Sequence, residues 1–225
     1  MVSPVLVLPF ILCAVIGYFV GSLPTGFLVA KAKGIDIRTV GSGNIGATNA
    51  MRILGKGPGI FVLVVDAAKG FLACAGIPVL LGILGLLPKD MSGLHQEWLT
   101  IVAGFTSILG HNFTCWLGFK GGKGIATSAG VLGAMVPVAL GIAFVCFAIV
   151  LAVTRYVSLG SLVAAVVLPF AAWLTGSTAS MIGISCAMSL LAFIKHRANI
   201  RRLIAGTEHR IGRKAASTGN SPHST

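Results

Sequence analysis

Three short segments of this sequence are rich in the residues that bind anions. They are GSGNIGATNAMR (41–52), GHNFTCWLGFKGGKGIATS (110–128) and KHRANIRRLIAGTEHR (195–210). Glycines expose backbone N–H groups, and cations and amide side chains add further donors, so such segments suit one or two phosphate groups. Carboxylates are nearly absent from them, with Glu208 as the exception. Because Mg²⁺ and Ca²⁺ require oxygen ligands, we expect a phosphate site without a metal ion.

The first segment carries Gly41, Gly43 and Gly46 in the spacing G-x-G-x-x-G of a dinucleotide-binding loop. That loop must follow a buried strand and open a helix in a βαβ unit. Here apolar runs long enough to span a membrane flank the segment, so the dinucleotide interpretation fails. The second segment is not a Walker A loop, because Gly124 follows Lys123 where Ser or Thr is required. What remains is the general property of glycines that bring backbone donors to an anion.

The composition places these segments in a membrane protein. Of the 225 residues, 56% are hydrophobic and 10% are charged, and the mean hydropathy is +0.95. A soluble domain has about 25% charged residues, so a soluble globular protein is excluded. The net charge of +12 is explained by the excess of Lys and Arg in cytoplasmic loops, and a nucleic-acid partner is not expected.

We predict an all-α polytopic membrane protein with about seven transmembrane helices, five being the alternative. The first three spans are expected over residues 4–30, 59–87 and 98–117. Basic residues are in excess in the loop 31–56, after the third span and beyond Lys195, but not in the loop 88–97. The positive-inside rule then places the N-terminus outside and the C-terminus in the cytoplasm.

The second half of the chain decides the number of crossings. Residues 157–175 and 181–194 are predicted to form a helical hairpin. The run 129–153 must then leave and return as two short half-helices, with a break at Pro137 or Gly141. In the alternative, one span covers 129–153 and a single long helix covers 157–194, which gives five crossings. Residues 1–211 are expected to form one membrane domain, and 212–225 a disordered tail.

Six motifs together resemble the PlsY-type acyl-phosphate:glycerol-3-phosphate acyltransferases of bacterial membranes. Besides the three anion-binding segments they are GSLPTG (21–26), DAAKG (66–70) and TRYVSLGS (154–161), all in the same order. The resemblance covers nearly the whole chain. Where that family often has Pro after GHNF, this chain has Thr114, for which we expect only a local backbone effect.

The resemblance implies transfer of a fatty acyl group from acyl phosphate to the 1-hydroxyl of glycerol 3-phosphate. The products would be 1-acyl-glycerol 3-phosphate, a lysophosphatidic acid, and inorganic phosphate, in the first acylation of phospholipid biosynthesis. It further implies a multi-pass protein of the bacterial inner membrane with its active site on the cytoplasmic side. The expected partners are both substrates and membrane lipids, with no cofactor, metal ion or obligate protein partner.

The residues agree with that chemistry. No His is followed five residues later by Asp, so the His-x-x-x-x-Asp pair of other acyltransferases is missing. An acyl phosphate is already activated and needs less help from a base. The expected catalytic residues are Lys120, Lys123, His196 and Asn199. The expected substrate-binding residues are Ser42, Gly43, Asn44, Thr48, Asn49, Arg52, Gly121, Gly122 and Ser158.

By resemblance and chemistry, Ser42, Asn44 and Arg52 are expected to position glycerol 3-phosphate, with Asn49 supporting the loop. The two lysines would hold the acyl phosphate and the charge that develops on its oxygens. The acceptor of the hydroxyl proton stays open between His196 and a substrate phosphate oxygen.

Other features also leave alternatives open. Asp66 and Lys69 form either a structural pair or part of the site, because charges within the membrane are usually paired, and His111 caps its helix or contacts the site. At the level of function, the alternatives are a transporter or channel for a phosphorylated solute and a structural membrane protein without a ligand.

Overall fold

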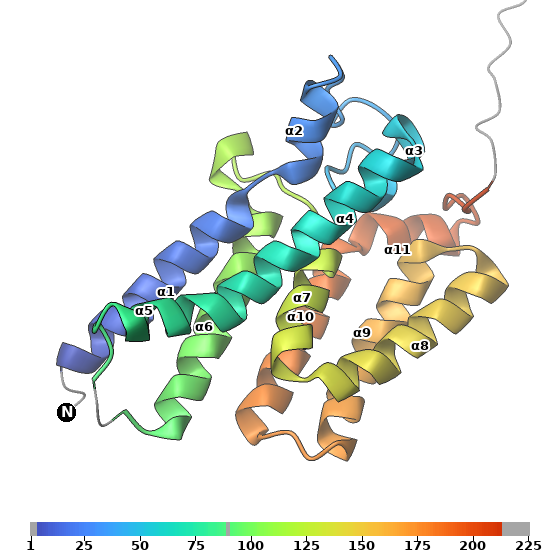
Figure 1. The fold of residues 1–225 in the computed structure, drawn as a ribbon. Coiled ribbons are helices and arrows are strands. Elements are labelled where there is room, and N and C mark those ends of the chain that lie inside the picture. The colour runs from blue at the N-terminus through green and yellow to red at the C-terminus, as the bar shows by residue number, and fades with distance from the viewer. Residues whose placement is uncertain (1–3, 89–90, 213–225) are drawn as a thin grey trace, which may run out of the picture.

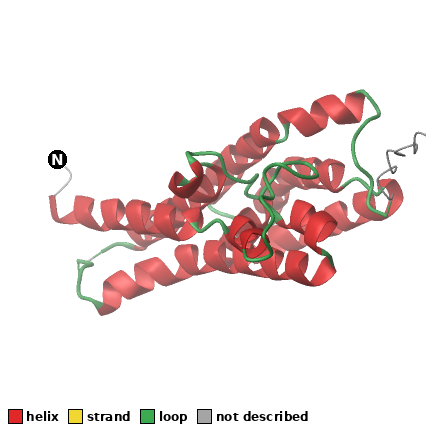
Figure 2. Cartoon of the chain, turned by 90° about the horizontal axis from the view of Figure 1, so that it is seen from above, coloured by secondary structure: helices red, strands yellow, loops and turns green. Residues whose placement is uncertain are grey.

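A computed structural model describes residues 4–88 and 91–212 of the chain, and every regular element in these ranges is a helix (Figures 1 and 2). The predicted all-α class is therefore confirmed for the described residues. Of the tail predicted over 212–225, only Gly212 lies within them.

The first half of the chain contains the three predicted apolar runs. The helices are α1 (Pro4–Ser22), α2 (Thr25–Lys31), α3 (Ala47–Leu54), α4 (Lys56–Phe71), α5 (Ile77–Ile83) and α6 (Gly93–Asn112), and a π-helical turn (Leu72–Gly76) joins α4 to α5. The first predicted span is broken between α1 and α2, where Pro24 lacks the N–H that would continue the helix.

The second half contains a 3₁₀ turn (Cys115–Leu117) and the helices α7 (Ile125–Met135), α8 (Pro137–Thr154), α9 (Val157–Leu174), α10 (Ala179–Lys195) and α11 (Arg197–Ile204). The predicted break falls at Pro137, the first residue of α8. The prediction of two half-helices is wrong for α8, whose 18 residues are long enough to cross a bilayer. The single helix over 157–194 is also wrong, because α9 and α10 are separate helices joined by a turn.

Close helix contacts hold the bundle together through small residues. Helix α1 packs along α6, and α4 packs along α7 (Figure 1). A methyl group on Gly21 would clash with the carbonyl oxygen of Ser107, and one on Gly130 would clash with that of Ala67. Such backbone approach is typical of helices that associate in lipid, where packing replaces the hydrophobic driving force.

The outer surface of the bundle is apolar, as a membrane protein requires. Val153 on α8 is 79% exposed and Leu174 on α9 is 73% exposed. Within residues 4–88 and 91–212, four helical segments are long and apolar enough to cross a membrane, or five if α10 and α11, which meet at 60°, count as one.

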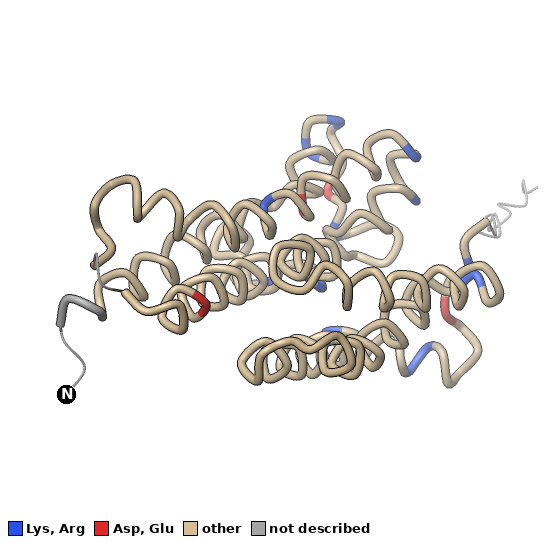
Figure 3. Tube along the Cα trace, turned by 60° about the horizontal axis from the view of Figure 1, so that its bottom comes forward, with Lys and Arg blue, Asp and Glu red and all other residues tan. Residues whose placement is uncertain are grey.

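Charged residues are distributed unequally between the two ends of the bundle. Lys and Arg gather toward the end that carries α2, α3 and α11, away from the N-terminus (Figure 3). Toward the other end, the carboxylate of Glu97 on α6 accepts hydrogen bonds from Thr178 and Ser180 at the start of α10. This asymmetry has the form expected from the positive-inside rule.

Candidate active site

The first anion-binding segment is held in shape by Asn49 of α3, which is almost fully buried. Its Nδ2 donates to the carbonyl oxygens of Val40, at 3.1 Å, and Ile37, at 3.3 Å. Its Oδ1 accepts from the backbone N–H of Ser42, at 2.9 Å, and from Nη1 of Arg52, at 3.2 Å. One amide side chain thus fixes both the loop and the orientation of an exposed arginine.

The remainder of this loop presents polar groups to the surface. Gly43 has a φ of 68°, a conformation that favours glycine. The side-chain oxygen of Asn44 accepts from the N–H of Gly46 at 2.9 Å, which closes the turn before α3. Ser42 and Thr48 are exposed, so their hydroxyl groups are accessible from solvent.

The second segment uses its glycines differently from the prediction. The N–H of Gly121 donates to the carbonyl of Asn112 at 3.2 Å, and that of Gly122 donates to the carbonyl of His111 at 3.0 Å. These two amides are therefore already paired and do not form an open phosphate cradle. Glycine is needed here because a side chain on either residue would clash with the end of α6.

The two lysines of this segment differ in environment. Lys120 is exposed, whereas Lys123 is partly buried. Burial lowers the pKa of Lys123 from 10.5 to about 8, against the opposing attraction of Glu208, and the positive charges of Arg202 and Arg52 lower it further. Helix α3, the segment before α7 and residues 202–208 thus bring charges within electrostatic reach of one another.

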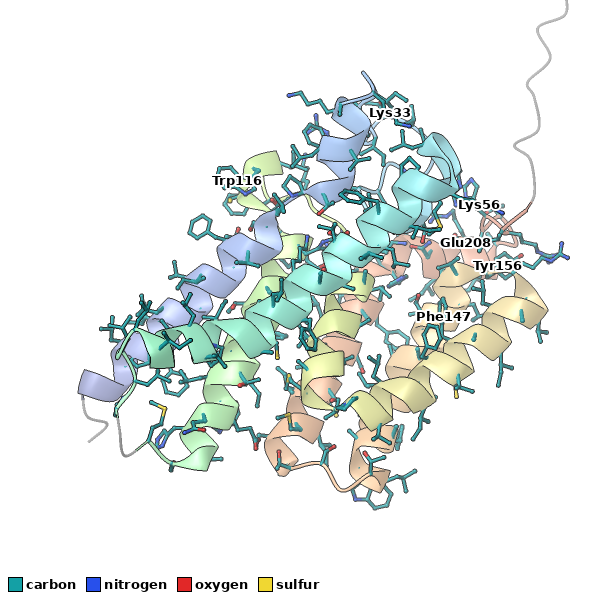
Figure 4. The ribbon with its side chains drawn as sticks, viewed as in Figure 1. Lys33, Lys56, Trp116, Phe147, Tyr156 and Glu208 are labelled. Atoms are coloured by element: carbon teal, nitrogen blue, oxygen red, sulfur yellow. The ribbon has the colours of Figure 1, made fainter. Side chains whose placement is uncertain are left out.

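Glu208, labelled in Figure 4, accepts hydrogen bonds from the third segment and from α9. Its carboxylate accepts from Asn199 Nδ2 at 2.6 Å, from Arg202 Nε at 2.7 Å and from Ser158 Oγ at 2.8 Å. Burial acts to raise the pKa of Glu208, but these hydrogen bonds hold it below the usual value. The sequence prediction missed this residue as part of the site, although a single carboxylate among many cations was a usable signal.

His196 lies between α10 and α11 and is 2% exposed. Its Nδ1 lies 2.8 Å from the carbonyl oxygen of Ala192. Since a carbonyl only accepts, Nδ1 carries the proton and Nε2 is left as an acceptor. Burial, followed by the positive charge of Lys123, lowers the pKa of His196 to about 4.

Asp66 and Lys69 of α4 form a buried ion pair with an N–O distance of 2.8 Å. His111 of α6 joins them, with its Nδ1 3.0 Å from Lys69 Nζ. Among the described residues, no group of three or more His, Cys, Asp and Glu side chains could hold a metal ion. The structure therefore combines a cationic surface, one central carboxylate and a neutral histidine, a set suited to phosphorylated ligands.

Known proteins resemble this chain over nearly its full length. The family model for glycerol-3-phosphate acyltransferase matches residues 11–206. Curated proteins named glycerol-3-phosphate acyltransferase include one from Synechococcus strain JA-3-3Ab, 45% identical over 92% of this chain and 96% of its own length. Another, from Geobacter sulfurreducens, is 42% identical over 87% of this chain and 94% of its own length.

Two crystal structures share the fold. Both are of PlsY, described as an integral membrane glycerol 3-phosphate acyltransferase. The glycerol 3-phosphate form is 35% identical, with a TM-score of 0.79 over 90% of this chain and 96% of that one. The lysophosphatidic acid form is 34% identical, with a TM-score of 0.77 over 90% and 95%.

Proposed function

Because this chain belongs to the glycerol-3-phosphate acyltransferase family and is an integral membrane acyltransferase, we propose that it acylates the 1-hydroxyl of glycerol 3-phosphate with an acyl phosphate. The hydroxyl oxygen attacks the acyl carbonyl carbon, and the bond from that carbon to the phosphate oxygen breaks. The products are 1-acyl-glycerol 3-phosphate and inorganic phosphate. The observation that carries the proposal is the convergence of Arg52, Lys123 and Arg202 around Glu208, since two phosphorylated substrates require several cations.

The substrate contacts follow from the accessible groups. Ser42, Asn44 and Arg52, with Thr48 and Gly43 beside them, hold glycerol 3-phosphate. A bidentate arginine contact with phosphate is supported by the hydrogen bond that orients Arg52 on Asn49.

On the facing segment, Lys123 binds the acyl phosphate and stabilises the negative charge that develops on its oxygens. Lys120, in the same turn, is exposed to solvent. Gly121 and Gly122 allow this turn to approach α6.

The hydroxyl proton passes to a phosphate oxygen of a substrate. His196 has its Nε2 free to accept, but an imidazole with a pKa near 4 is a weak base at neutral pH. Asn199 and Ser158 act indirectly, because both are bonded to Glu208 and fix its carboxylate near Lys123.

The site faces the cytoplasm at the bacterial inner membrane, where it carries out the first acylation of phospholipid biosynthesis. The gathering of Lys and Arg at that end supports this orientation (Figure 3). We infer seven crossings, made by α1, the α4–α5 segment, α6, α7, α8, α9 and α10, with the N-terminus outside.

The test is turnover by the purified protein in detergent with acyl phosphate and glycerol 3-phosphate. Release of phosphate together with formation of lysophosphatidic acid is expected, and EDTA should leave the rate unchanged. Formation of lysophosphatidic acid from acyl-CoA but not from acyl phosphate would show that acyl phosphate is not the acyl donor. No product from either donor with folded protein would overturn the proposed function.

A further inference from the structure

A cluster of buried charged and polar groups lies beside the site but outside the proposed chemistry. The ammonium group of Lys69 contacts Asp66 Oδ1 at 2.8 Å, the carbonyl of Leu23 at 2.8 Å and Nδ1 of His111 at 3.0 Å. Thr25 donates to Asp66 Oδ1 at 3.1 Å. All four side chains are at most 6% exposed. The cluster thus joins the break between α1 and α2 to α4 and to the last turn of α6.

The hydrogen bonds of this cluster determine the state of His111. An ammonium group has three N–H donors, and Lys69 has three acceptors within reach, one of them Nδ1 of His111. Nδ1 therefore accepts and carries no proton. The distance of 3.6 Å from this atom to Asp66 Oδ1 is too long for a hydrogen bond, which agrees with that assignment. His111 is neutral, with its proton on Nε2.

Nε2 of His111 faces the turn that carries Lys123. A methyl group on Gly122 would clash with this nitrogen, so the imidazole ring lies directly against the glycine. The backbone of the same turn is bonded to the end of α6, through Gly122 to the carbonyl of His111 and through Gly121 to that of Asn112. A displacement of His111 would therefore displace the turn and, with it, Lys123.

We propose that Asp66 and Lys69 are positioning residues, which hold His111 and through it the turn Gly121–Lys123 in the geometry that binds the acyl phosphate. The inference rests on the proposed function only for the identity of that substrate. Stability alone is a weak reason for such a pair, because replacing a buried ion pair with apolar residues of similar volume is often neutral or stabilising. A buried ion pair at this position, beside the proposed phosphate-binding turn, is better explained by what it orients.

The decisive variant replaces both charges at once, Asp66→Leu with Lys69→Met, so that no unpaired charge is left in the membrane. We expect a protein that still folds, with a melting temperature lowered because Thr25, the Leu23 carbonyl and His111 lose a partner. The KM for acyl phosphate should rise about tenfold or more, and kcat should change less than threefold. In hydrogen exchange, the amides of Gly121 and Gly122 should lose protection. Glu97→Gln, which alters a carboxylate at the other end of α6, is the matched control and should leave all three measurements unchanged.

A second pair of variants tests the link through His111. His111→Asn keeps an acceptor for Lys69 and should retain a KM within about threefold of wild type, whereas His111→Leu should raise it as the double variant does. A folded double variant with wild-type KM and wild-type exchange at Gly121 and Gly122 would overturn the proposal. The exchange measurement does not depend on turnover, so an inactive wild-type protein would refute the proposed function and still leave the positioning role tested.

Discussion

Replacing Lys123 with Met is expected to make the protein more stable and less active. The side chain is partly buried, and burial lowers the pKa of its ammonium group from 10.5 to about 8. At 1.36 kcal/mol for each pKa unit, holding the charge in the folded protein costs about 3 kcal/mol at neutral pH. Methionine fills a similar volume without that cost, so its free energy of unfolding should rise by up to about 3 kcal/mol.

The size of this effect depends on pH in a defined direction. Because the folded pKa lies below the unfolded value, the cost is present in full below pH 8. Between about pH 8 and 10.5 the folded protein loses the Lys123 proton before the unfolded chain does, so the destabilisation by this charge declines. The difference in free energy of unfolding between wild type and Lys123→Met should therefore decrease. A bound phosphate opposes this loss, so wild-type affinity for acyl phosphate should fall as the pH rises through 8.

Thermal unfolding in detergent at pH 7 and pH 10 tests the predicted gain in stability, and steady-state kinetics at pH 7 test the predicted loss of activity. For a chain of this size, 3 kcal/mol corresponds to a rise of roughly 6 to 12 °C in the melting temperature. kcat/KM should fall about 100-fold, as expected when a charged hydrogen-bond donor is lost from the developing oxyanion. Lys33→Met removes an exposed lysine and is the control. A Lys123→Met protein that melts at or below the wild-type temperature, or that turns over normally, would refute the reasoning.

Three further outcomes follow from the site and the packing. Arg52→Ala should lower kcat/KM for glycerol 3-phosphate about 10- to 100-fold, measured with saturating acyl phosphate, because it removes a charge-assisted hydrogen bond. An unchanged value would mean that Arg52 does not bind this substrate. The ring signals of His196 in an NMR titration should stay constant between pH 5 and 8, since its pKa is about 4, and a titration near pH 6.5 would restore it as a candidate base. Gly130→Ala should destabilise the fold by about 1–3 kcal/mol, because the new methyl group meets the carbonyl of Ala67. Gly141→Ala, with open space around the added methyl group, should leave the melting temperature equal or higher.

Composition and the positions of prolines were sufficient to predict much of the fold. The apolar runs and the break at Pro137 follow from side-chain chemistry that acts locally, and helices cover most of the expected spans. The third span is displaced, because α6 covers 93–112 where 98–117 was expected. The interruption before α2 was not predicted, although Pro24 stands between the polar residues Ser22 and Thr25; Val7–Lys31 still forms one candidate span. The transporter and ligand-free alternatives are wrong, since the chain is an acyltransferase.

The sequence singles out the segments of the candidate site but not the contacts between them. Glycine-rich motifs indicate close backbone approach, yet only the fold reveals that the amides of Gly121 and Gly122 pair with α6. Thr114 shows the same limit. A local effect was expected, but its hydroxyl donates at 2.6 Å to the carbonyl of Ser22 on α1. Composition marks Glu208 as the single carboxylate of its segment, but its bonds to α9 and α11 depend on tertiary packing, which no local pattern encodes.

The position of Glu208 in the chain also bears on biosynthesis. The loop around Ser42 leaves the ribosome early, but the carboxylate that gathers Ser158, Asn199 and Arg202 is among the last residues of the described fold to be translated. In a nascent chain, α1 to α10 are therefore translated before Glu208, and the bonds that join Ser158, Asn199 and Arg202 form only when synthesis of the described fold is nearly finished.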